Sequence, residues 1–331
     1  MNGGCTISVI VPTYNSCASI APCIEALLAA GFSPCDIVVV DDASSVPVLP
    51  LVTDHGVKLI EIAQNRGAGN ARNVGAAASD AEVLFFVDAD VCVHPDTREV
   101  LEHLLASYPD HAAVFGTYDD APAHKSPISR IRNLLHRHVH VRNAGEATTF
   151  WSGCGAIRRK DFDAVDGFCK VRRTIEDIDI GMKLAQHGRK IRLCPTLQGK
   201  HLKRWTLRNM TYTDLFLRAI PWARLMRSGP GKDAPEALNV SGVSKVSAMA
   251  VATSLLGVLM LAVLPAPGLL TVMCALVVLA VANKSFLDVL DGPADRTAAL
   301  GVLWVHYLCG GFGFFWVRSG LDAVFCGAKN R

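Results

Sequence analysis

Short apolar runs alternate with helical patterns over the first 90 residues. The apolar runs lie at 8–15, 36–40, 58–62 and 83–87, and the helical patterns at 18–30 and 68–78. Apolar strands joined by helices are typical of an α/β fold, here a mostly parallel sheet with flanking helices on both faces. Three runs end in polar residues: Tyr14-Asn15, Asp41-Asp42 and Asp88-Ala-Asp90. Ligands bind beyond the carboxyl ends of such strands, so one polar crevice is predicted there.

A different pattern occupies the end of the chain. No charged residue occurs from Val246 to Asn283, and the cluster from Pro265 to Gly268 divides this run in two because it interrupts a helix. A further uncharged stretch, 297–317, carries aromatic residues near its ends. These lengths predict two to three transmembrane helices. Three spans would place Arg318 across the membrane from the N-terminal domain, against the positive-inside tendency.

Two basic segments lie between these regions. Residues 198–227 hold seven Lys and Arg residues and one acid, interleaved with apolar side chains, and Pro221 should kink them. This predicts an amphipathic helix on an anionic membrane surface, the alternative being a solvated face with a core stripe. Residues 125–142 contain basic residues, three histidines and no acid, and predict a solvated or membrane-facing basic surface. The alternate spacing of the histidines argues against a metal site there.

Composition agrees with this division. The last 86 of 331 residues contain nine of the 63 charged side chains. We expect a domain at 1–212, an interfacial helix and linker at 213–243, and a transmembrane region at 244–331. The net charge of +3 argues against nucleic acid as a partner. Eleven scattered cysteines and the lack of an export signal indicate that the first domain is cytoplasmic and reduced, on a multi-pass protein of the inner or cell membrane.

The candidate chemistry rests on carboxylates rather than on a nucleotide motif. The segment from Gly67 to Arg72 lacks the third glycine of a dinucleotide fingerprint, and there is no phosphate-binding G-K-[ST] loop. Asp88 and Asp90 follow a buried run, and hard oxygen ligands of this kind suit Mg²⁺ or Mn²⁺; the alternative is a pair of exposed loop acids. Further along, 151–158 is a loop of small residues that lets a ligand approach the backbone.

A second acidic pair, Glu176 and Asp177, stands at a predicted helix start. A carboxylate at this place is stabilised by the helix dipole. The pair is therefore either a helix cap or a general base.

Six motifs together resemble family 2 glycosyltransferases, whose domain has the GT-A nucleotide-diphospho-sugar transferase fold. The resemblance covers about residues 6–205 and rests on the order and spacing of Val9-Ile-Val-Pro-Thr-Tyr-Asn15, Val39-Val-Asp-Asp-Ala-Ser44, Asn65-Arg-Gly-Ala-Gly-Asn-Ala-Arg-Asn-Val-Gly75, Asp88-Ala-Asp90, Gly153-Cys-Gly-Ala-Ile-Arg-Arg159 and Glu176-Asp-Ile-Asp179.

The resemblance implies a role for each matching residue. The nucleotide-sugar donor would be held by Pro12, Tyr14, Asp42, Arg72 and Asp88, and the metal by Asp90 with Asp88. Asp177, with Glu176 beside it, would remove the acceptor proton and give inversion at the anomeric carbon. Residues implied on the acceptor side are Trp151, Gly153, Cys154, Arg204 and Trp205.

One motif departs from the family. His201-Leu-Lys-Arg204-Trp205 resembles the acceptor motif Q-x-x-R-W, with histidine in place of glutamine. His201 is therefore a third candidate metal ligand or a diphosphate contact, or else a surface histidine. Trp205 would stack on an acceptor sugar or anchor the helix that follows.

The implied activity is a metal-dependent, membrane-bound transfer of one sugar to a hydroxyl of a lipid-linked or glycan acceptor, as in cell-envelope glycan synthesis. A hydroxyl needs a base, whereas a polyprenyl phosphate is already ionised. Two alternatives stay open: a polyprenyl-phosphate glycosyltransferase, and a catalytically silent nucleotide-sugar-binding scaffold at the membrane. In each case membrane lipids are expected partners.

Overall fold

The computed structural model describes residues 6–227 and 242–320. The described residues divide into two compact units. The first contains 6–124 and 136–203, and the second contains 125–135, 204–227 and 242–320. Of the interfacial segment expected at 213–243, residues 228–241 lie outside the described residues, as do 321–331 at the end of the chain.

The first unit begins with four parallel strands, as the apolar runs predicted. The elements in chain order are β1 (Ile7–Thr13), α1 (Ile20–Ala29), η1 (Pro34–Asp36), β2 (Ile37–Asp41), α2 (Leu49–Thr53), β3 (Lys58–Glu61), α3 (Ala68–Ala77) and β4 (Val83–Val87). Strand β2 shows why both faces need helices. Ile37 and Val39 pack in the cluster that contains α1, whereas Val38 and Val40 pack against Ala71 of α3.

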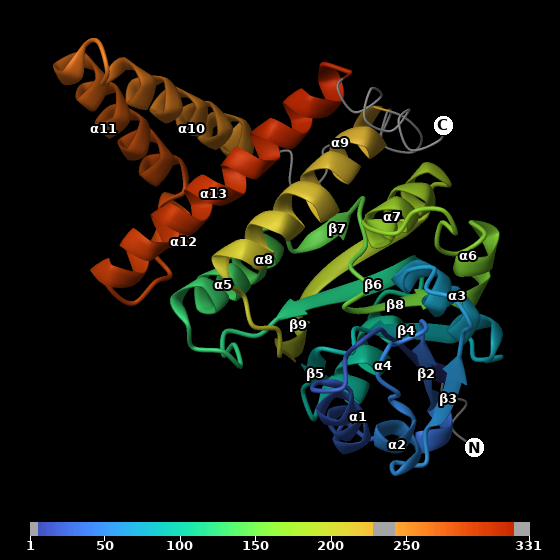
Figure 1. Cartoon of the computed structure of the whole chain (residues 1–331). Coiled ribbons are helices and arrows are strands. Elements are labelled where there is room, and N and C mark those ends of the chain that lie inside the picture. The colour runs from blue at the N-terminus through green and yellow to red at the C-terminus, as the bar shows by residue number, and fades with distance from the viewer. Residues whose placement is uncertain (1–5, 228–241, 321–331) are drawn as a thin grey trace. The chain divides into compact units, whose positions relative to one another are not determined.

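The remaining strands make the sheet mixed. They are β5 (Val91–Val93), β6 (His111–Tyr118), β7 (Gly145–Ala147), β8 (Cys154–Arg158) and β9 (Lys190–His201), with helices α4 (Thr97–Ser107), α6 (Arg159–Ala164) and α7 (Glu176–Gln186). Within the described residues, nine strands form one sheet in the order β3-β2-β1-β4-β8-β6-β9-β5, with β7 paired to β9 (Figure 1). Strand β8 is antiparallel to β4 and β6.

Strand β8 also corrects a prediction. The small-residue segment 151–158 was expected to be a loop, but 154–158 forms a strand. Its glycine is the reason: a Cβ at Gly155 would lie 2.5 Å from the Trp151 carbonyl oxygen and 2.7 Å from the Phe150 ring. The small residues therefore serve close packing in the sheet.

Helix α3 approaches the sheet closely at Gly75. A Cβ there would lie 2.5 Å from Ile10 Cγ2 and 3.2 Å from Val40 Cγ2. We predict that Gly75→Ala lowers the stability of the first unit, because overpacking costs about 1–3 kcal/mol and alanine regains only about 1 kcal/mol of helix propensity. Thermal unfolding followed by circular dichroism measures this. Gly301→Ala, a helical position with open space around it, is the control and should not lower the unfolding temperature.

The second unit contains the basic and apolar segments. Residues 127–135 of helix α5 (Pro127–Arg142) belong to this unit. Helices α8 (Leu207–Tyr212), η2 (Thr213–Ala219) and α9 (Ile220–Arg227) follow one another as a continuous helical segment. η2 is a turn of π-helix. It ends two residues before Pro221, which has no N–H to donate, so the predicted irregularity takes the form of a π-bulge.

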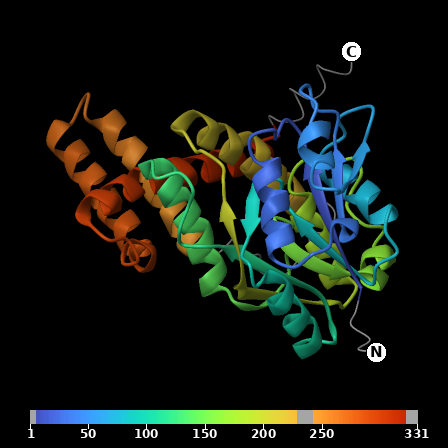
Figure 2. The ribbon, with the colours of Figure 1, turned by 90° about the horizontal axis from the view of Figure 1, so that it is seen from below.

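The uncharged runs are helical, as predicted. The last elements are α10 (Gly242–Met260), α11 (Pro265–Ala282), α12 (Lys284–Leu287) and α13 (Pro293–Arg318). Helices α10, α11 and α13 are each long and apolar enough to cross a membrane. Pro265 stands at the start of α11, and α10 and α11 lie side by side as a hairpin (Figures 1 and 2).

Candidate active site

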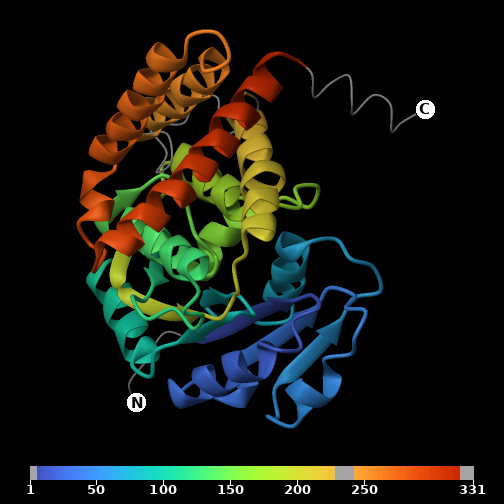
Figure 3. The same cartoon turned by 60° about the vertical axis from the view of Figure 1, so that its left-hand side comes forward.

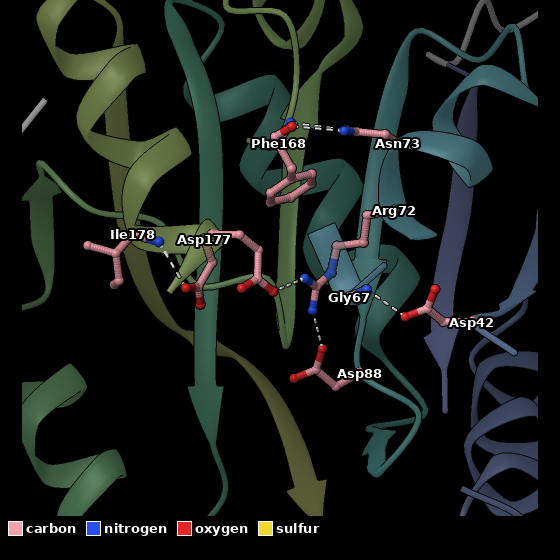
Figure 4. Close-up of polar contacts among 9 residues, drawn as sticks. Asp42, Gly67, Arg72, Asn73, Asp88, Phe168, Asp177 and Ile178 are labelled. Carbon is pink, nitrogen blue, oxygen red and sulfur yellow. Dashed lines mark hydrogen bonds and ion pairs between the residues drawn. The ribbon is translucent and has the colours of Figure 1, made fainter. Parts of the chain in front are cut away.

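Arg72 of α3 is buried and joins two carboxylates from distant parts of the chain. Its Nη2 donates to Asp88 Oδ1 and its Nη1 to Glu176 Oε1, both at 2.6 Å. Arg72 points toward Asp88 at the end of β4, and the ring of Phe168 lies 5.4 Å from the guanidinium (Figure 4). Burial alone would lower the pKa of Arg72, but the charges of Asp88 and Glu176 raise it. The bridge therefore fixes α3, β4 and α7 together.

The loop that carries Phe168 is fixed by a side chain that the sequence analysis did not single out. Asn73 donates from Nδ2 to the Phe168 carbonyl at 2.8 Å and accepts from the Phe168 N–H at 2.9 Å. Asn73 follows Arg72 within the resembling segment, but nothing in the pattern of that segment indicates its partner. The pair holds the aromatic ring beside Arg72.

Asp177 lies beside this bridge in the first turn of α7. Its Oδ1 accepts from the Ile178 N–H at 2.8 Å, and the side chain is partly buried (Figure 4). Burial, and next the charge of Glu176, raise the pKa of Asp177 to about 7. Ile175, which immediately precedes this helix, has a positive φ of 55°. Strained backbone of this kind is frequent at functional sites. The two acids of the predicted pair differ: Glu176 is buried and bound to Arg72, whereas Asp177 has the raised pKa of a base.

The loops after β1 and β2 are tied together. Asn15 Oδ1 accepts from the N–H of Ser45 at 2.9 Å, and the Asn15 N–H donates to Ser44 Oγ at 2.8 Å. Asn15 and Ala43 both have positive φ. Tyr14 is 51 % exposed at this place, whereas Pro12 is buried in β1.

Asp42 organises the loop that precedes α3. Its two carboxylate oxygens accept the N–H groups of Arg66 at 2.9 Å and Gly67 at 2.7 Å. Figure 4 shows the contact with Gly67. Gly67 has a φ of +96°, which favours glycine. Asp42 is itself buried. It therefore shapes the loop near the donor residues predicted from the sequence, and its contact with a nucleotide base stays a prediction.

Asp90 and His201 form the candidate metal site. His201 Nε2 lies 3.6 Å from Asp90 Oδ2, and the imidazole stacks on Tyr118 with ring centroids 4.2 Å apart. Burial alone would raise the pKa of Asp90, but the hydrogen bond and charge of His201, with Lys203, lower it. An ionised carboxylate and an imidazole are a donor set that Mn²⁺ accepts.

The candidate metal site offers few protein ligands. Over residues 6–227 and 242–320, no group of three or more His, Cys, Asp or Glu side chains is placed to hold a metal. Ions of the Mg²⁺ type are usually held by one or two carboxylates together with substrate phosphates. Asp88, the other predicted ligand, already accepts from Arg72 through Oδ1.

The three acceptor candidates around β8 are not equivalent. Trp151 is partly buried and packs on Tyr118, with ring centroids 4.9 Å apart. Gly153 makes room for it, since a Cβ there would lie 2.4 Å from the indole ring. Cys154 is fully buried in the core, and burial raises the pKa of its thiol. Its side chain is therefore closed to an acceptor, and only Trp151 retains an exposed edge.

Part of the basic segment 125–142, predicted to be a solvated or membrane-facing surface, is buried in the structure. His140 of α5 is buried beside β6, where its Nδ1 lies 3.0 Å from the Gly116 carbonyl oxygen. Burial lowers its pKa to about 4, so it is neutral at physiological pH. His136 and His140 share one helix face and both contact Trp151. The three histidines alternate along the sequence, but His136 and His140 are four residues apart and therefore lie on the same face of the helix.

Arg204 and Trp205 belong to the second unit. Trp205 is buried, its N–H donates to Ser129 Oγ at 2.8 Å, and the guanidinium of Arg132 lies 5.7 Å from the indole ring. This placement favours anchoring of the following helix over stacking on a sugar. Arg204 is exposed, and its carbonyl accepts from Asn209 at the start of α8.

Comparisons with known proteins agree with the motifs. Residues 8–166 match the family model described as Glycosyl transferase family 2. An uncharacterised glycosyltransferase of Haemophilus influenzae is 28 % identical over 192 residues, which are 54 % of this chain and 62 % of that protein. The chain thus spans less than two thirds of the length of this relative. The O-antigen chain rhamnosyltransferase RfbN of Salmonella typhimurium is 25 % identical over 242 residues, or 68 % of this chain and 76 % of the relative.

A solved structure shows the same fold. The mannosyltransferase PcManGT from Pyrobaculum calidifontis, in complex with GDP-Man and Mn²⁺, has a TM-score of 0.60 and 18 % identity. The similarity covers 96 % of this chain and 89 % of that protein. The predicted GT-A fold is confirmed.

Proposed function

We propose that the protein moves one sugar from a nucleotide-diphosphate donor to a hydroxyl of a lipid-linked or glycan acceptor, because residues 8–166 match the model of glycosyl transferase family 2. The observation that carries the proposal is Asp177. It is a partly buried carboxylate with a pKa near 7, held next to the Arg72 bridge at the start of α7. A base is most effective when its pKa is close to the working pH.

The donor would lie along the carboxyl ends of β1, β2 and β4. Tyr14 offers an exposed ring there, Asp42 shapes the loop before α3, and Arg72 fixes Asp88. In this arrangement Arg72 acts by positioning, since its guanidinium is buried between two acids. Glu176 likewise positions Arg72, and Asp177 alone receives the acceptor proton.

A divalent ion would be held by Asp90 and His201. When bound, Mg²⁺ or Mn²⁺ would neutralise charge that develops on the departing nucleoside diphosphate. The complex of PcManGT with GDP-Man and Mn²⁺ supports this assignment by analogy of fold.

The acceptor would reach the domain at a membrane surface. Support comes from the three apolar helices, each long enough to cross a bilayer, and from the exposed apolar side chains of the basic segment α8–α9, such as Tyr212 and Phe216. The name of the O-antigen chain rhamnosyltransferase, a relative at 25 % identity, agrees with a glycan acceptor. We assign the catalytic domain to the cytoplasmic side, where nucleotide-sugars are made.

Donor profiling tests this function. The purified full-length protein would be incubated with a panel of nucleotide-sugars and Mn²⁺, with and without membrane lipid extract, while release of nucleoside diphosphate is followed. We expect release with one donor, increased by the extract. If no donor gives release under either condition, the protein is better explained as a nucleotide-sugar-binding scaffold.

The pH dependence of transfer follows from Asp177. Its carboxyl must be ionised to accept a proton, and its pKa is raised to about 7. We predict that kcat/KM falls about tenfold for each pH unit below that value and levels off above it. Initial rates over the range from about pH 5 to about pH 9 measure the profile. A rate that stays level through this range would contradict the role of Asp177 as base.

Asp90→Asn tests the metal site. Loss of the ionised ligand should weaken Mn²⁺ binding, measured in the presence of nucleoside diphosphate, by at least about tenfold, since even outer-shell changes at metal sites reach this size. Isothermal titration calorimetry gives the affinity without recourse to activity. The exposed Asp110→Asn is the matched control and should bind Mn²⁺ as the native protein does. Equal affinity in the two variants would remove Asp90 from the site.

A further inference from the structure

Helix α13 is long and apolar enough to cross a membrane, yet it is bonded to charged side chains along its whole length. The bonds occur near residue 295, at residue 306 and at residue 317, and all lie within the second unit. Their partners belong to the basic helices α5, η2 and α9.

At its start, α13 is held by Arg130 of α5. The guanidinium pairs with Asp295 in the first turn of α13, and also with Asp291, at 2.5 Å, in the preceding turn. Arg130 and Asp295 are both partly exposed and Asp291 is 85 % exposed. This end of the helix therefore lies in a polar environment.

At its middle, α13 contributes to a charged cluster. His306 Nδ1 lies 2.9 Å from Asp214 Oδ2, and Asp214 is paired with Arg132 of α5. Arg218 lies 3.9 Å from the same carboxylate. Burial alone would raise the pKa of Asp214, but the charge of Arg132 and the hydrogen bond of His306 lower it to about 2, so the carboxylate stays ionised.

The carboxylate belongs to the π-helical turn η2, whose wider backbone precedes Pro221. Such turns are frequent at functional sites. Here the turn places Asp214 against both α5 and α13.

At its end, α13 packs on α9. Arg227 donates to the Val317 carbonyl at 2.8 Å, and Val317 packs with Ile220 and Ala223. Gly313 allows close approach, since a Cβ there would lie 2.7 Å from Ala219 Cβ. Helix α13 runs alongside η2 and α9 in both views (Figures 1 and 3).

These contacts do not suit a membrane span. Asp295 and Val317 are about 33 Å apart along the helix axis, which is about the thickness of the hydrocarbon layer. If α13 crossed, either Arg130 or Arg227 would lie on the far side. The ionised Asp214 and its arginine partners would lie near the bilayer centre, where charged groups are costly.

We propose that α13 lies along the membrane surface together with α8, η2 and α9, and that only the α10–α11 hairpin enters the hydrocarbon layer. Phe312, Phe314 and Phe315 are exposed on α13 and would dip into the acyl boundary, as the apolar face of an interfacial helix does. The hairpin instead exposes large apolar side chains on both of its helices and at its turn: Leu256, Leu259, Val263, Leu270, Val277 and Val281.

The consequence is a chain whose described ends lie on one side of the membrane, because a hairpin returns to the side from which it enters. Ser319, just after α13, would then share the side of the N-terminal domain. This placement keeps Arg318 on the cytoplasmic side and removes the conflict with the positive-inside tendency. It concerns membrane attachment and does not depend on which reaction is catalysed.

Labelling of cysteines in the full-length protein tests the topology. Right-side-out and inverted membrane vesicles would be treated with a membrane-impermeant maleimide. The labelled cysteines would then be identified by peptide mapping. The native, exposed Cys35 marks the side of the N-terminal domain. Ser319→Cys reports the end of α13, and Val263→Cys, 81 % exposed, reports the turn of the hairpin.

We expect Ser319→Cys to be labelled in the same vesicles as Cys35. Val263→Cys should be labelled only in the vesicles of opposite orientation or, if the hairpin ends within the bilayer, in neither. Labelling of Ser319→Cys on the side opposite to Cys35 makes α13 a third span and overturns the proposal. Labelling of Val263→Cys on the Cys35 side overturns it as well, because the hairpin would then not enter the membrane.

Discussion

Arg72→Met is expected to lower kcat/KM by at least about 100-fold, the loss that follows from a displacement of about 1 Å at a reacting centre. It should also lower the free energy of unfolding by about 3–5 kcal/mol, as removal of one partner from a buried ion pair does. The cause is geometric: one guanidinium binds Asp88 and Glu176 at 2.6 Å each. Without it, two like charges remain close together and Asp177 loses its neighbouring cation. Enzyme kinetics and urea unfolding measure the two effects.

Two further variants separate position from charge. Arg72→Lys keeps the positive charge but lacks the planar fork, so it should recover part of the stability and little of the activity. Arg98→Met removes a partly exposed arginine that pairs with Glu102 on α4, and it should retain nearly native kinetics. If Arg72→Met is stable and transfers sugar at the native rate, the bridge has no positioning role.

The strands of the first half were predictable because their own residues determine them. Val83–Val87 is apolar throughout, and a run of five such residues is stable only when both faces of the strand are covered. Strand β8 was missed for the opposite reason. Its small residues resemble a loop in sequence, and only the neighbouring Phe150 and Trp151 show why they are needed there.

The site was predictable to the extent that its residues follow strands or begin helices. Asp88 and Glu176 were found in this way, but their link through Arg72 was not, because Arg72 and Glu176 lie 104 residues apart in the chain. Distance in sequence also hid the cluster of Arg132, Asp214 and His306. The composition of these segments shows only that they are basic or apolar. Which of their side chains are buried depends on the neighbouring helices against which they pack.

The contrast between Glu176 and Asp177 shows how a fold assigns different roles to neighbouring acids. Glu176 is bound to the buried guanidinium of Arg72 at 2.6 Å. Asp177 is desolvated and repelled by Glu176, which favours its neutral form and raises its pKa. One residue is thereby suited to hold Arg72 and the other to take up a proton.

Asp177→Asn is therefore expected to lower sugar transfer by roughly 100- to 10,000-fold, the usual contribution of general base catalysis. An amide has nearly the same size and accepts the Ile178 N–H through its oxygen, so the fold should be retained. Binding of nucleotide-sugar, measured by calorimetry, should be unchanged, and the decline of activity below about pH 7 should disappear from the residual rate. Asp163→Asn, an exposed acid on α6, is the matched control and should transfer as the native protein does. Transfer to lipid at the native rate by Asp177→Asn would refute the base assignment and favour an acceptor that is already ionised, such as a polyprenyl phosphate.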